Sequence, residues 1–507
     1  MTRSKPFQFA ATGLLIAAYI GLRLWHLADS CLWFDEIFSV HAAEHPWGEI
    51  LQFAAADLIH PPLFYALLKL WIGIGGEGVF WMRLLPVTAA VVSIFPFISL
   101  IRELKISRRV EIISLLFIIV NGSLLKYSQE LRMYSLLMCF SLFSMWLFAR
   151  YFVKGKSYIP LVIANVLLVY THYFGWFVVV PEVAIILYFQ RIKWRRALAM
   201  LGIVAASFMP WAVAIFGASN SGAGLAQNIG WMSRPGIIEI TTFFLNLCEP
   251  LYYRVSSVEP YSIYRVTLPI LLIVGAAKIH FFVSWKNRSD AEKQTIKVLY
   301  ILTAVPIVGA LTLSWLLPYS IWGTRHLILV FPLVAIFMGI FLDALKDTRI
   351  RVAAFTLLAL FTGYAFVIEL RQPAREFSWC AWEPLTTEAV STGAPTIKIY
   401  LLEDLAAYHV WFALRDDANN RSNVFKIVGI ENVREDKAYF LPRGFDGVTT
   451  VNLDGITDEK FWLGFRGKPI EEFERPITDI LGRGYRIVDR KRVSTNEETV
   501  TFYLLEK

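Results

Sequence analysis

The sequence has few charged residues and few cysteines, and both shortages narrow its class. Only 18% of the 507 residues are charged, whereas 56% are hydrophobic and the mean hydropathy is +0.52. Because soluble globular chains carry about 25% charged residues, this composition excludes an ordinary soluble protein and predicts a polytopic membrane protein. The four cysteines lack metal-type spacing and suggest no disulfide framework, with a bridge involving Cys31, Cys248 or Cys380 left open.

Common catalytic and nucleotide-binding motifs are also missing. The sequence contains no P-loop, HExxH, paired CxxC or GxSxG pattern, which removes support for ATP-driven transport and common hydrolase chemistry. Gly73, Gly75 and Gly78 formally match GxGxxG, but they follow an apolar helical stretch and not a strand. Dinucleotide binding therefore fails the test of structural context.

Basic residues are absent from a long acidic stretch near the N-terminus. No Lys or Arg occurs between Leu24 and Leu68, whereas six Asp and Glu do. The stretch follows the first apolar span, residues 7–27, which we expect to stay as an uncleaved anchor because it is long for a secretory signal. Carboxylates held at a membrane surface are costly and usually functional, so this loop is the best candidate for part of an active site.

Charge and hydropathy together predict the topology. Before residue 372 there are 31 Lys and Arg against 19 Asp and Glu, and from there on 18 against 22. The basic residues of the first part lie in short clusters between apolar spans, at 102–109, 150–156, 191–196, 286–297 and 346–351. Such clusters are typical of cytoplasmic loops and not of nucleic-acid binding. Eleven runs are long enough to cross a membrane: 7–27, 83–101, 110–126, 132–152, 157–173, 174–190, 197–216, 264–285, 298–317, 326–345 and 352–370.

This topology fixes the expected sides and domains. The N-terminus is cytoplasmic and the C-terminus extracytoplasmic, with the chain in the inner (cytoplasmic) membrane. Since only one crossing fits between the acidic loop and the basic cluster at 102–109, we expect the short run 61–76 to be an interfacial helix on the outer face. The predicted fold is a polytopic α-helical membrane domain over 1–371, with an external loop at 28–82. A small α/β domain, extracytoplasmic, follows over 372–507, because strand and helix patterns alternate there.

Candidate functional residues gather in the expected outer loops. Asp35 and Glu36 form a carboxylate pair that either begins an interfacial helix or presents a general base to a hydroxyl acceptor. Asp57 and His60 precede a Pro-Pro sequence. They either face lipid headgroups or, in the case of His60, donate a hydrogen bond to a phosphate leaving group.

Three further outer turns place polar residues at the ends of apolar spans. Arg is suited to bidentate phosphate binding, so the arginines of these turns are candidate phosphate ligands. The aromatic residues among them are equally typical of a plain aromatic belt. The positions are Glu130, Arg132, Tyr134, His172, Tyr173, Arg325 and His326.

Taken together, these motifs resemble the bacterial membrane glycosyltransferases of the protein O-mannosyltransferase-like group, which have the GT-C fold and fall near glycosyltransferase family 39. The matching features are the Asp-Glu pair, HPPL followed by a Tyr, YSQELRMYSL, YTHYFG and TRHLILVFPL, within about residues 7–345. The resemblance implies a sugar donor linked to polyprenyl phosphate, and transfer with inversion on the extracytoplasmic face.

The resemblance also implies roles for individual residues. Asp35 would be the general base, with Glu36 beside it. The positions expected near the donor phosphate are His60, Gln129, Arg132 and Arg325. The positions expected to bind or support the substrate are Asp57, Tyr65, Glu130, Tyr134, His172, Tyr173 and His326.

One departure bears on the acceptor. The protein mannosyltransferases have Gly-Lys after HPPL, whereas this chain has Phe64 and Tyr65, and it shows no MIR-type insertion. We therefore expect a hydroxyl of a lipid or a surface glycan as acceptor, with a protein O-mannosyltransferase as the alternative.

Two other classes stay open. One is a glycan ligase with a pyrophosphate-linked donor, and the other is a non-enzymatic lipid or sugar transporter, which would place ionisable residues at the bilayer midplane. The expected partners are the donor, the acceptor and membrane lipids. A divalent metal is possible, but two carboxylates are too few ligands to predict one.

Overall fold

The chain divides into two units in the computed structural model, which describes residues 5–220, 230, 232–251, 263–371, 378–392, 398–415, 427–431, 448–467, 475–495 and 498–507. The first, here called the helical unit, comprises residues 1–27, 45–254 and 259–372. The second, the C-terminal unit, comprises 373–507 together with 28–44 and 255–258.

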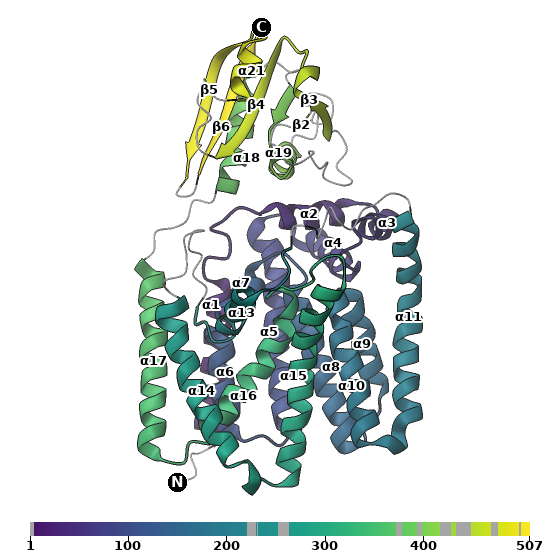
Figure 1. The fold of residues 1–507 in the computed structure, drawn as a ribbon, viewed down its shortest axis with the longest axis vertical. Helices are drawn as coiled ribbons and strands as arrows, with labels where there is room; N and C mark the ends of the chain where they lie inside the picture. Colours follow the sequence, from purple (N-terminus) through teal and green to yellow (C-terminus); the bar gives the residue numbers. More distant parts are fainter. Residues whose placement is uncertain are drawn as a thin grey trace. The chain divides into compact units, whose positions relative to one another are not determined.

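The helical unit is built from apolar helices that lie side by side (Figure 1). Its α-helices are α1 (Lys5–Leu24), α3 (Trp47–Asp57), α4 (Leu63–Gly75), α5 (Val79–Glu103), α6 (Arg108–Val120), α7 (Gly122–Gln129), α8 (Tyr134–Lys154), α9 (Ile159–Thr171), α10 (Trp176–Phe189), α11 (Trp194–Asn220), α13 (Ile237–Asn246), α14 (Leu268–Val283), α15 (Asp290–Leu316), α16 (Phe331–Asp343) and α17 (Thr348–Arg371). Short helices of other types are η1 (Tyr173–Gly175), η2 (Arg191–Lys193), η3 (Ile263–Thr267), η4 (Trp285–Asn287) and η5 (His326–Val330).

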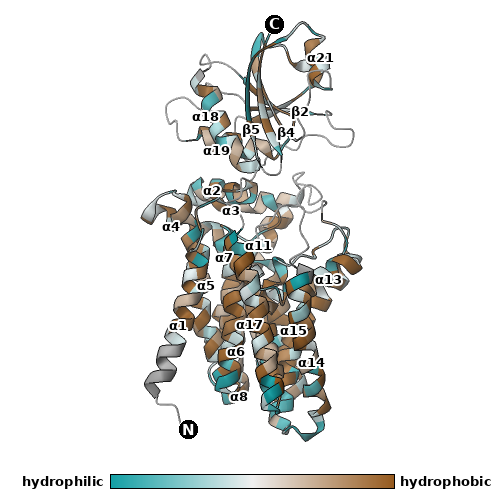
Figure 2. Ribbon diagram, turned by 90° about the vertical axis from the view of Figure 1, so that its left-hand side faces the viewer, coloured by the Kyte–Doolittle hydropathy of each residue, from teal (hydrophilic) through white to brown (hydrophobic). Residues whose placement is uncertain are grey.

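Seven helices in the described part of the chain are long and apolar enough to cross a membrane. They belong to α5, α8, α11, α14, α15, α16 with η5, and α17, and Figure 2 shows hydrophobic residues along such helices. The remaining four predicted spans contain α1, α6, α9 and α10, but the span 110–126 is not one helix, because the chain breaks at Asn121 between α6 and α7. The chain is therefore a multi-pass membrane protein, and the number of crossings stays a prediction.

The predicted interfacial run forms α4, a helix of only 13 residues. At 1.5 Å per residue it spans about 20 Å, and because α6 and α9 have the same length, helix length alone does not separate α4 from the predicted crossings. The indoles of Trp71 and Trp81 stack 4.7 Å apart, and each donates a hydrogen bond to the other's backbone carbonyl, at 2.7 and 2.9 Å. These bonds fasten the end of α4 to the start of α5.

Loops that carry predicted cytoplasmic clusters meet at one end of the helical unit. Arg102 donates two hydrogen bonds to the carboxylate of Glu111, both at 3.1 Å. Lys154, at the end of α8, forms an ion pair of 2.7 Å with Glu103, at the end of α5. The ends of α5 and α8 and the start of α6 therefore lie together, as the predicted alternation of sides requires.

The C-terminal unit is an α/β sandwich, which confirms the predicted fold class. Its six-stranded sheet has the order β3-β2-β1-β4-β6-β5, parallel among the first four and antiparallel at β6 and β5. The strands are β1 (Lys398–Leu401), β2 (Ile427–Glu431), β3 (Val448–Asn452), β4 (Lys460–Gly467), β5 (Arg486–Ser494) and β6 (Thr499–Glu506). The helices are α2 (Phe34–Glu44), η6 (Ser378–Ala381), α18 (Trp382–Thr392), α19 (Ala406–Leu414), η7 (Leu453–Gly455) and α21 (Ile477–Leu481).

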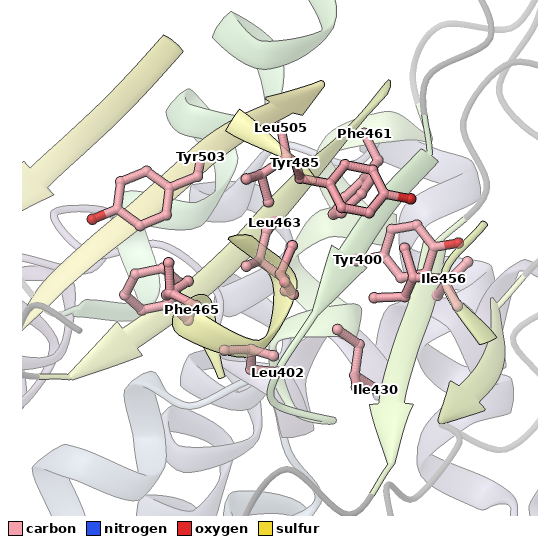
Figure 3. Close-up of a cluster of buried hydrophobic side chains, with 13 residues drawn as sticks. Tyr400, Leu402, Ile430, Ile456, Phe461, Leu463, Phe465, Tyr485, Tyr503 and Leu505 are labelled. Carbon is pink, nitrogen blue, oxygen red and sulfur yellow. The ribbon is translucent and has the colours of Figure 1, made fainter. Parts of the chain in front are cut away.

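Apolar side chains cover both faces of this sheet. On one face Phe461, Leu463 and Tyr503 of β4 and β6 join a core to which α21 also contributes (Figure 3). On the other face Trp382 of α18 packs against Phe502 of β6, with ring centroids 5.7 Å apart. Phe502 and Tyr503, neighbours on β6, thus face different layers, as the two-residue period of a strand demands.

A disulfide joins two distant parts of the C-terminal unit. Cys31, just before α2, is bonded to Cys380 of η6, across 349 residues of sequence. Cys139 and Cys248 are buried and free. The sequence places residues 28–44 in the external loop of the membrane domain, whereas contacts group them with residues 373–507.

Candidate active site

The turn between α3 and α4 sets Asp57 and His60 side by side. The helix α3 ends at Asp57, and Leu58 adopts the left-handed conformation with φ 63° that reverses the chain. Pro61 and Pro62 then lead into α4, since a proline is compatible with a helix start. His60 Nδ1 lies 3.4 Å from Asp57 Oδ2, and both side chains are buried.

Arg132 reaches the same place from the turn between α7 and α8. Its guanidinium Nη2 lies 3.4 Å from Nδ1 and 3.5 Å from Nε2 of His60. The backbone N–H of Arg132 donates to the carbonyl of Glu130 at 2.7 Å, which keeps the turn tight. Glu130, in the same turn, and Tyr65, in α4, are both buried. The structure thus brings together Arg132 and His60, which the sequence separates by 72 residues.

Two more histidines extend this group. The ring of His172 lies 5.5 Å from that of His60 and 5.4 Å from that of His326. The N–H of Phe174 donates to His172 Nδ1 at 3.1 Å, so in the neutral ring the proton lies on Nε2. This Nε2 is buried and has no hydrogen-bond partner within the described ranges. His172 therefore has an N–H available for a ligand.

Tyr134 and Arg325 complete the group. The Tyr134 ring lies 6.4 Å from that of His172 and 6.3 Å from that of His326. The guanidinium carbon of Arg325 is 6.0 Å from the centroid of the Tyr134 ring. We call the set of Asp57, His60, Arg132, Tyr134, His172, Arg325 and His326 the histidine-arginine cluster.

The electrostatics of the cluster favour an anion. Burial lowers the pKa of His60 well below the usual 6.5, and the charges of Arg132 and Arg325 lower it further. His60 is therefore neutral at neutral pH and acts as a hydrogen-bonding group. The positive charge comes from the two arginines, and the carboxylates beside them in the described residues include Asp57 and the buried Glu130 of the Arg132 turn.

Tyr173 has a supporting position beside the cluster. Its hydroxyl donates to the carbonyl of Leu58 at 3.3 Å and accepts from Trp211 Nε1 at 3.2 Å. These bonds tie η1 and α11 to the turn that carries His60. Trp211 was not singled out from the sequence, because one Trp in an apolar run carries no signal of a specific contact.

The described contacts of Gln129 lie elsewhere in the helical unit. Its amide Nε2 donates to the carbonyls of Arg23 and Trp25, at 3.1 and 2.7 Å. Those carbonyls stand at the end of α1, where the backbone lacks helical partners. Gln129 is thus used to fasten α1 to α7, and its predicted contact with a donor phosphate is not among these bonds.

The structure separates the carboxylate pair into two environments. Glu36 is buried, and its Oε2 accepts from the backbone N–H of Trp33 at 3.1 Å, in the first turn of α2. Asp35 is partly exposed, and its backbone carbonyl accepts from Ser39 Oγ at 3.0 Å. Glu36 thus resembles a helix-capping carboxylate. Both belong to the C-terminal unit, whereas the histidine-arginine cluster belongs to the helical unit.

Sequence reasoning missed several buried ionisable residues of the helical unit, among them Arg23 and Glu182. Arg23 is fully buried and donates to the carbonyls of Tyr19 and Ile118, at 3.2 and 3.1 Å. Glu182 accepts hydrogen bonds from Ser144 at 2.7 Å and from Asn165 at 3.0 Å. Each is an ionisable residue inside an apolar run, and this position in the sequence could have identified it.

Within the described ranges, no group of three or more His, Cys, Asp and Glu side chains is arranged to hold a metal ion. The two guanidinium groups are the cations that the structure itself places at the cluster.

Comparisons with known proteins give a structural likeness. No family model and no curated protein matches the chain. The crystal structure of ArnT from Cupriavidus metallidurans in the apo state is similar over 97% of this chain and 98% of its own, with a TM-score of 0.57 and 12% identity. The structure of the same protein bound to undecaprenyl phosphate is similar over 97% of both chains, with a TM-score of 0.58 and 11% identity.

A weaker likeness, with a TM-score of 0.49 and 13% identity, links 80% of this chain to 63% of the Archaeoglobus fulgidus oligosaccharyltransferase. The likeness to ArnT spans nearly the whole of both chains. The chain therefore has the GT-C fold that its motifs predicted.

Proposed function

We propose that this protein is a membrane glycosyltransferase that moves a sugar from a polyprenyl-phosphate donor to a hydroxyl group of a lipid or surface glycan. The observation that carries the proposal is the histidine-arginine cluster, in which two guanidinium groups and a buried imidazole N–H suit a phosphate group. The fold shared with ArnT, which has been crystallised with undecaprenyl phosphate, supports a lipid phosphate as the ligand.

In the proposed reaction Asp35 is the general base. Its carboxylate can take the proton of the acceptor hydroxyl. The acceptor oxygen bonds to the anomeric carbon as the bond from that carbon to the phosphate oxygen breaks, which inverts the configuration. The partial exposure of Asp35, against the buried capping position of Glu36, favours Asp35 for this role.

The departing polyprenyl phosphate carries away the bonding electron pair and gains negative charge. Arg132 and Arg325 compensate that charge, and the Nε2–H of His172 donates to a phosphate oxygen. Each preorganised donor of this kind lowers an activation barrier by about 3 kcal/mol. Asp57 beside His60 orients the imidazole, as a carboxylate commonly does for a functional histidine.

The proposed side of the membrane is the extracytoplasmic one. Disulfides persist in oxidising compartments such as the bacterial periplasm and are rare in the cytosol. The Cys31–Cys380 bridge lies in the same unit as Asp35, so it supports an extracytoplasmic C-terminal unit and base. The basic clusters support the same orientation, since they carry the signature of cytoplasmic loops.

Substitution of Arg132 tests the donor site. In membranes supplied with a radiolabelled polyprenyl-phosphate sugar, Arg132→Ala should lower transfer by about 100- to 1000-fold, since it removes one charged donor to the leaving phosphate. Arg132→Lys should recover only part of the rate, because an ammonium group lacks the planar fork of a guanidinium.

Arg349→Ala is the matched control, because this exposed arginine belongs to a predicted cytoplasmic cluster at the start of α17. Transfer by Arg132→Ala at the rate of the control would contradict the assignment of the cluster to the donor phosphate.

A further inference from the structure

The helix that carries Asp35 is attached to the C-terminal unit along its whole length. The Cys31–Cys380 bridge lies just before α2. In the first turn, the Phe34 ring lies 5.8 Å from Trp379 and 6.3 Å from Tyr408. In the last turn, the His41 ring lies 4.5 Å from that of Trp411, and Glu44 pairs with Arg415 at 3.3 Å. The contacts of α2 therefore follow the successive turns of α19.

The partners of α2 are themselves fixed by the sheet. The Trp379 ring stacks on His409 of α19, with centroids 5.1 Å apart and an interplanar angle of 17°. The guanidinium carbon of Arg466, on β4, lies 3.9 Å from the centroid of the same ring. Glu403 binds Arg466 through bonds of 2.6 to 3.0 Å, and Glu498 adds one of 2.9 Å.

A continuous set of contacts therefore runs from β4 through Arg466 and Trp379 to Phe34, which precedes Asp35. The Cys31–Cys380 disulfide adds a covalent link between the segment before α2 and η6. A terminal domain that merely followed the membrane helices would need no such attachment to a helix from the N-terminal part of the sequence.

We propose that the C-terminal unit positions the general base for transfer, with the Cys31–Cys380 bridge, Trp379 and Arg466 as positioning residues. This inference rests on the proposed function, because it concerns the same carboxylate. It gives the C-terminal unit a part in the reaction, and it predicts that reduction of the Cys31–Cys380 disulfide slows transfer.

The test separates positioning from general stability. The full-length chain with Cys31→Ser and Cys380→Ser should transfer at least about tenfold more slowly, since small displacements of a catalytic group cost about that much or more. The KM for the polyprenyl-phosphate donor should stay within about twofold of wild type, because the donor cluster belongs to the helical unit. Trp379→Leu should act in the same direction. Cys139→Ser is the control, because Cys139 is free and buried.

A second measurement does not depend on transfer. In hydrogen exchange of the full chain, opening the bridge should raise exchange in residues 34–44 and leave α8 and α16 unchanged. Wild-type rates together with unchanged exchange in 34–44 would overturn the positioning role while leaving the transferase proposal intact. If the wild type transfers no sugar but exchange in 34–44 rises as expected, the proposed function fails and the attachment of α2 stands.

An independent observation lies at the other end of the helical unit. A cavity of about 770 Å³ opens among α5, α8, α15 and α16 and the loops at their ends. This volume lies within the range of ligand pockets, about 300–1,000 Å³. Much of the lining is apolar, with Met145, Phe148 and Leu302 among the contributors.

Cations from three loops line the same cavity. They are Lys105, Arg288 and Lys346, each from a different predicted cytoplasmic cluster. Two of the three acids in the lining pair with cations, Glu103 with Lys154 at 2.7 Å and Glu292 with Arg288 at 3.6 Å. Asp343 accepts from Ser107 at 3.1 Å. The ammonium groups of Lys105 and Lys346 have no ion-pair or hydrogen-bond partner in the described part of the chain.

We infer that this cavity binds a lipid with a phosphate headgroup, whose phosphate meets Lys105 and Lys346 and whose hydrocarbon chain occupies the apolar lining. Basic pockets between membrane helices on the cytoplasmic side bind anionic lipid headgroups in this way. The proposed donor cluster contributes no residue to this cavity, so the two sites are distinct.

Native mass spectrometry of the detergent-purified chain tests this inference. The wild type should retain phosphatidylglycerol several-fold more than phosphatidylcholine, and the double variant Lys105→Gln/Lys346→Gln should lose that preference. Lys297→Gln is the control, because this exposed lysine of α15 does not line the cavity. Undecaprenyl phosphate, in a separate arm, shows whether the preferred lipid resembles the donor. Equal retention of anionic and zwitterionic lipid, or a preference unchanged in the double variant, would overturn the inference.

Discussion

At the scale of single residues, burial decides which of the ionisable groups can carry charge. The pKa of His60 is lowered because its ring is buried beside arginines, so His60 serves the proposed site as a neutral hydrogen-bonding group. The same physics acts in the C-terminal unit, where His409 is fully buried and neither ring nitrogen has a partner within the described ranges. Burial, with a smaller effect of Arg466, lowers the pKa of His409 to about 3.

This lowered pKa predicts that acid weakens the C-terminal unit. Below pH 6.5 the unfolded chain binds a proton at His409 that the folded chain does not bind, so stability falls as pH drops from about 6.5 toward 3. His409→Phe keeps a ring against Trp379 and should reduce this loss. Hydrogen exchange of residues 398–415, corrected for the intrinsic effect of pH and compared at pH 7 and pH 5, measures it. An equal response of wild type and variant would show that other groups cause the acid sensitivity.

At the scale of elements, helices α6 and α16 of the helical unit pack closely against each other. A Cβ atom added to Gly339 of α16 would lie 2.5 Å from Ser114 Oγ and 3.0 Å from the Val110 carbonyl of α6. Small residues allow membrane helices this approach, and van der Waals contact then holds them. Because α16 follows directly after η5, this packing also supports the position of His326.

Gly339→Val should therefore destabilise the helical unit by about 1–3 kcal/mol, the usual cost of overpacking. The midpoint of thermal unfolding in detergent should fall. Gly363→Val of α17 is the control, because a Cβ atom there meets nothing within 4 Å. Equal midpoints for the two variants would contradict the close packing of α6 and α16.

The limits of sequence reasoning are clearest at this scale. The apolar runs predicted the helices well, because a membrane helix needs a continuous apolar stretch that one reads directly from the chain. The turns of His60 and Arg132 converge because helices distant in the sequence pack together. No local sequence pattern records that packing. The pairing of Cys31 with Cys380 was left open for the same reason, and with it the attachment of α2 to the C-terminal unit.

At the scale of the whole molecule, the predicted alternation of sides can be tested directly. Gly78→Cys and Ile106→Cys flank α5, and a membrane-impermeant thiol reagent should label them from opposite sides of the membrane. Cys139 and Cys248 are changed to Ser in the same background to remove their thiols. Labelling of both positions from one side would refute the single crossing and, with it, the interfacial placement of α4.

The central claim is that Asp35 removes a proton from the acceptor during transfer. Asp35→Asn keeps the size of the side chain but cannot accept the proton, so it should lower the rate of transfer by about 100- to 10,000-fold with little change in the KM for the donor. Glu36→Gln, which changes the neighbouring carboxylate in the same way, should lower it far less, because Glu36 is held by the backbone N–H of Trp33. The decisive measurement is single-turnover transfer of a labelled sugar from polyprenyl phosphate by these two variants. Loss in Asp35→Asn alone is the predicted result, and transfer by Asp35→Asn at the wild-type rate would contradict the account.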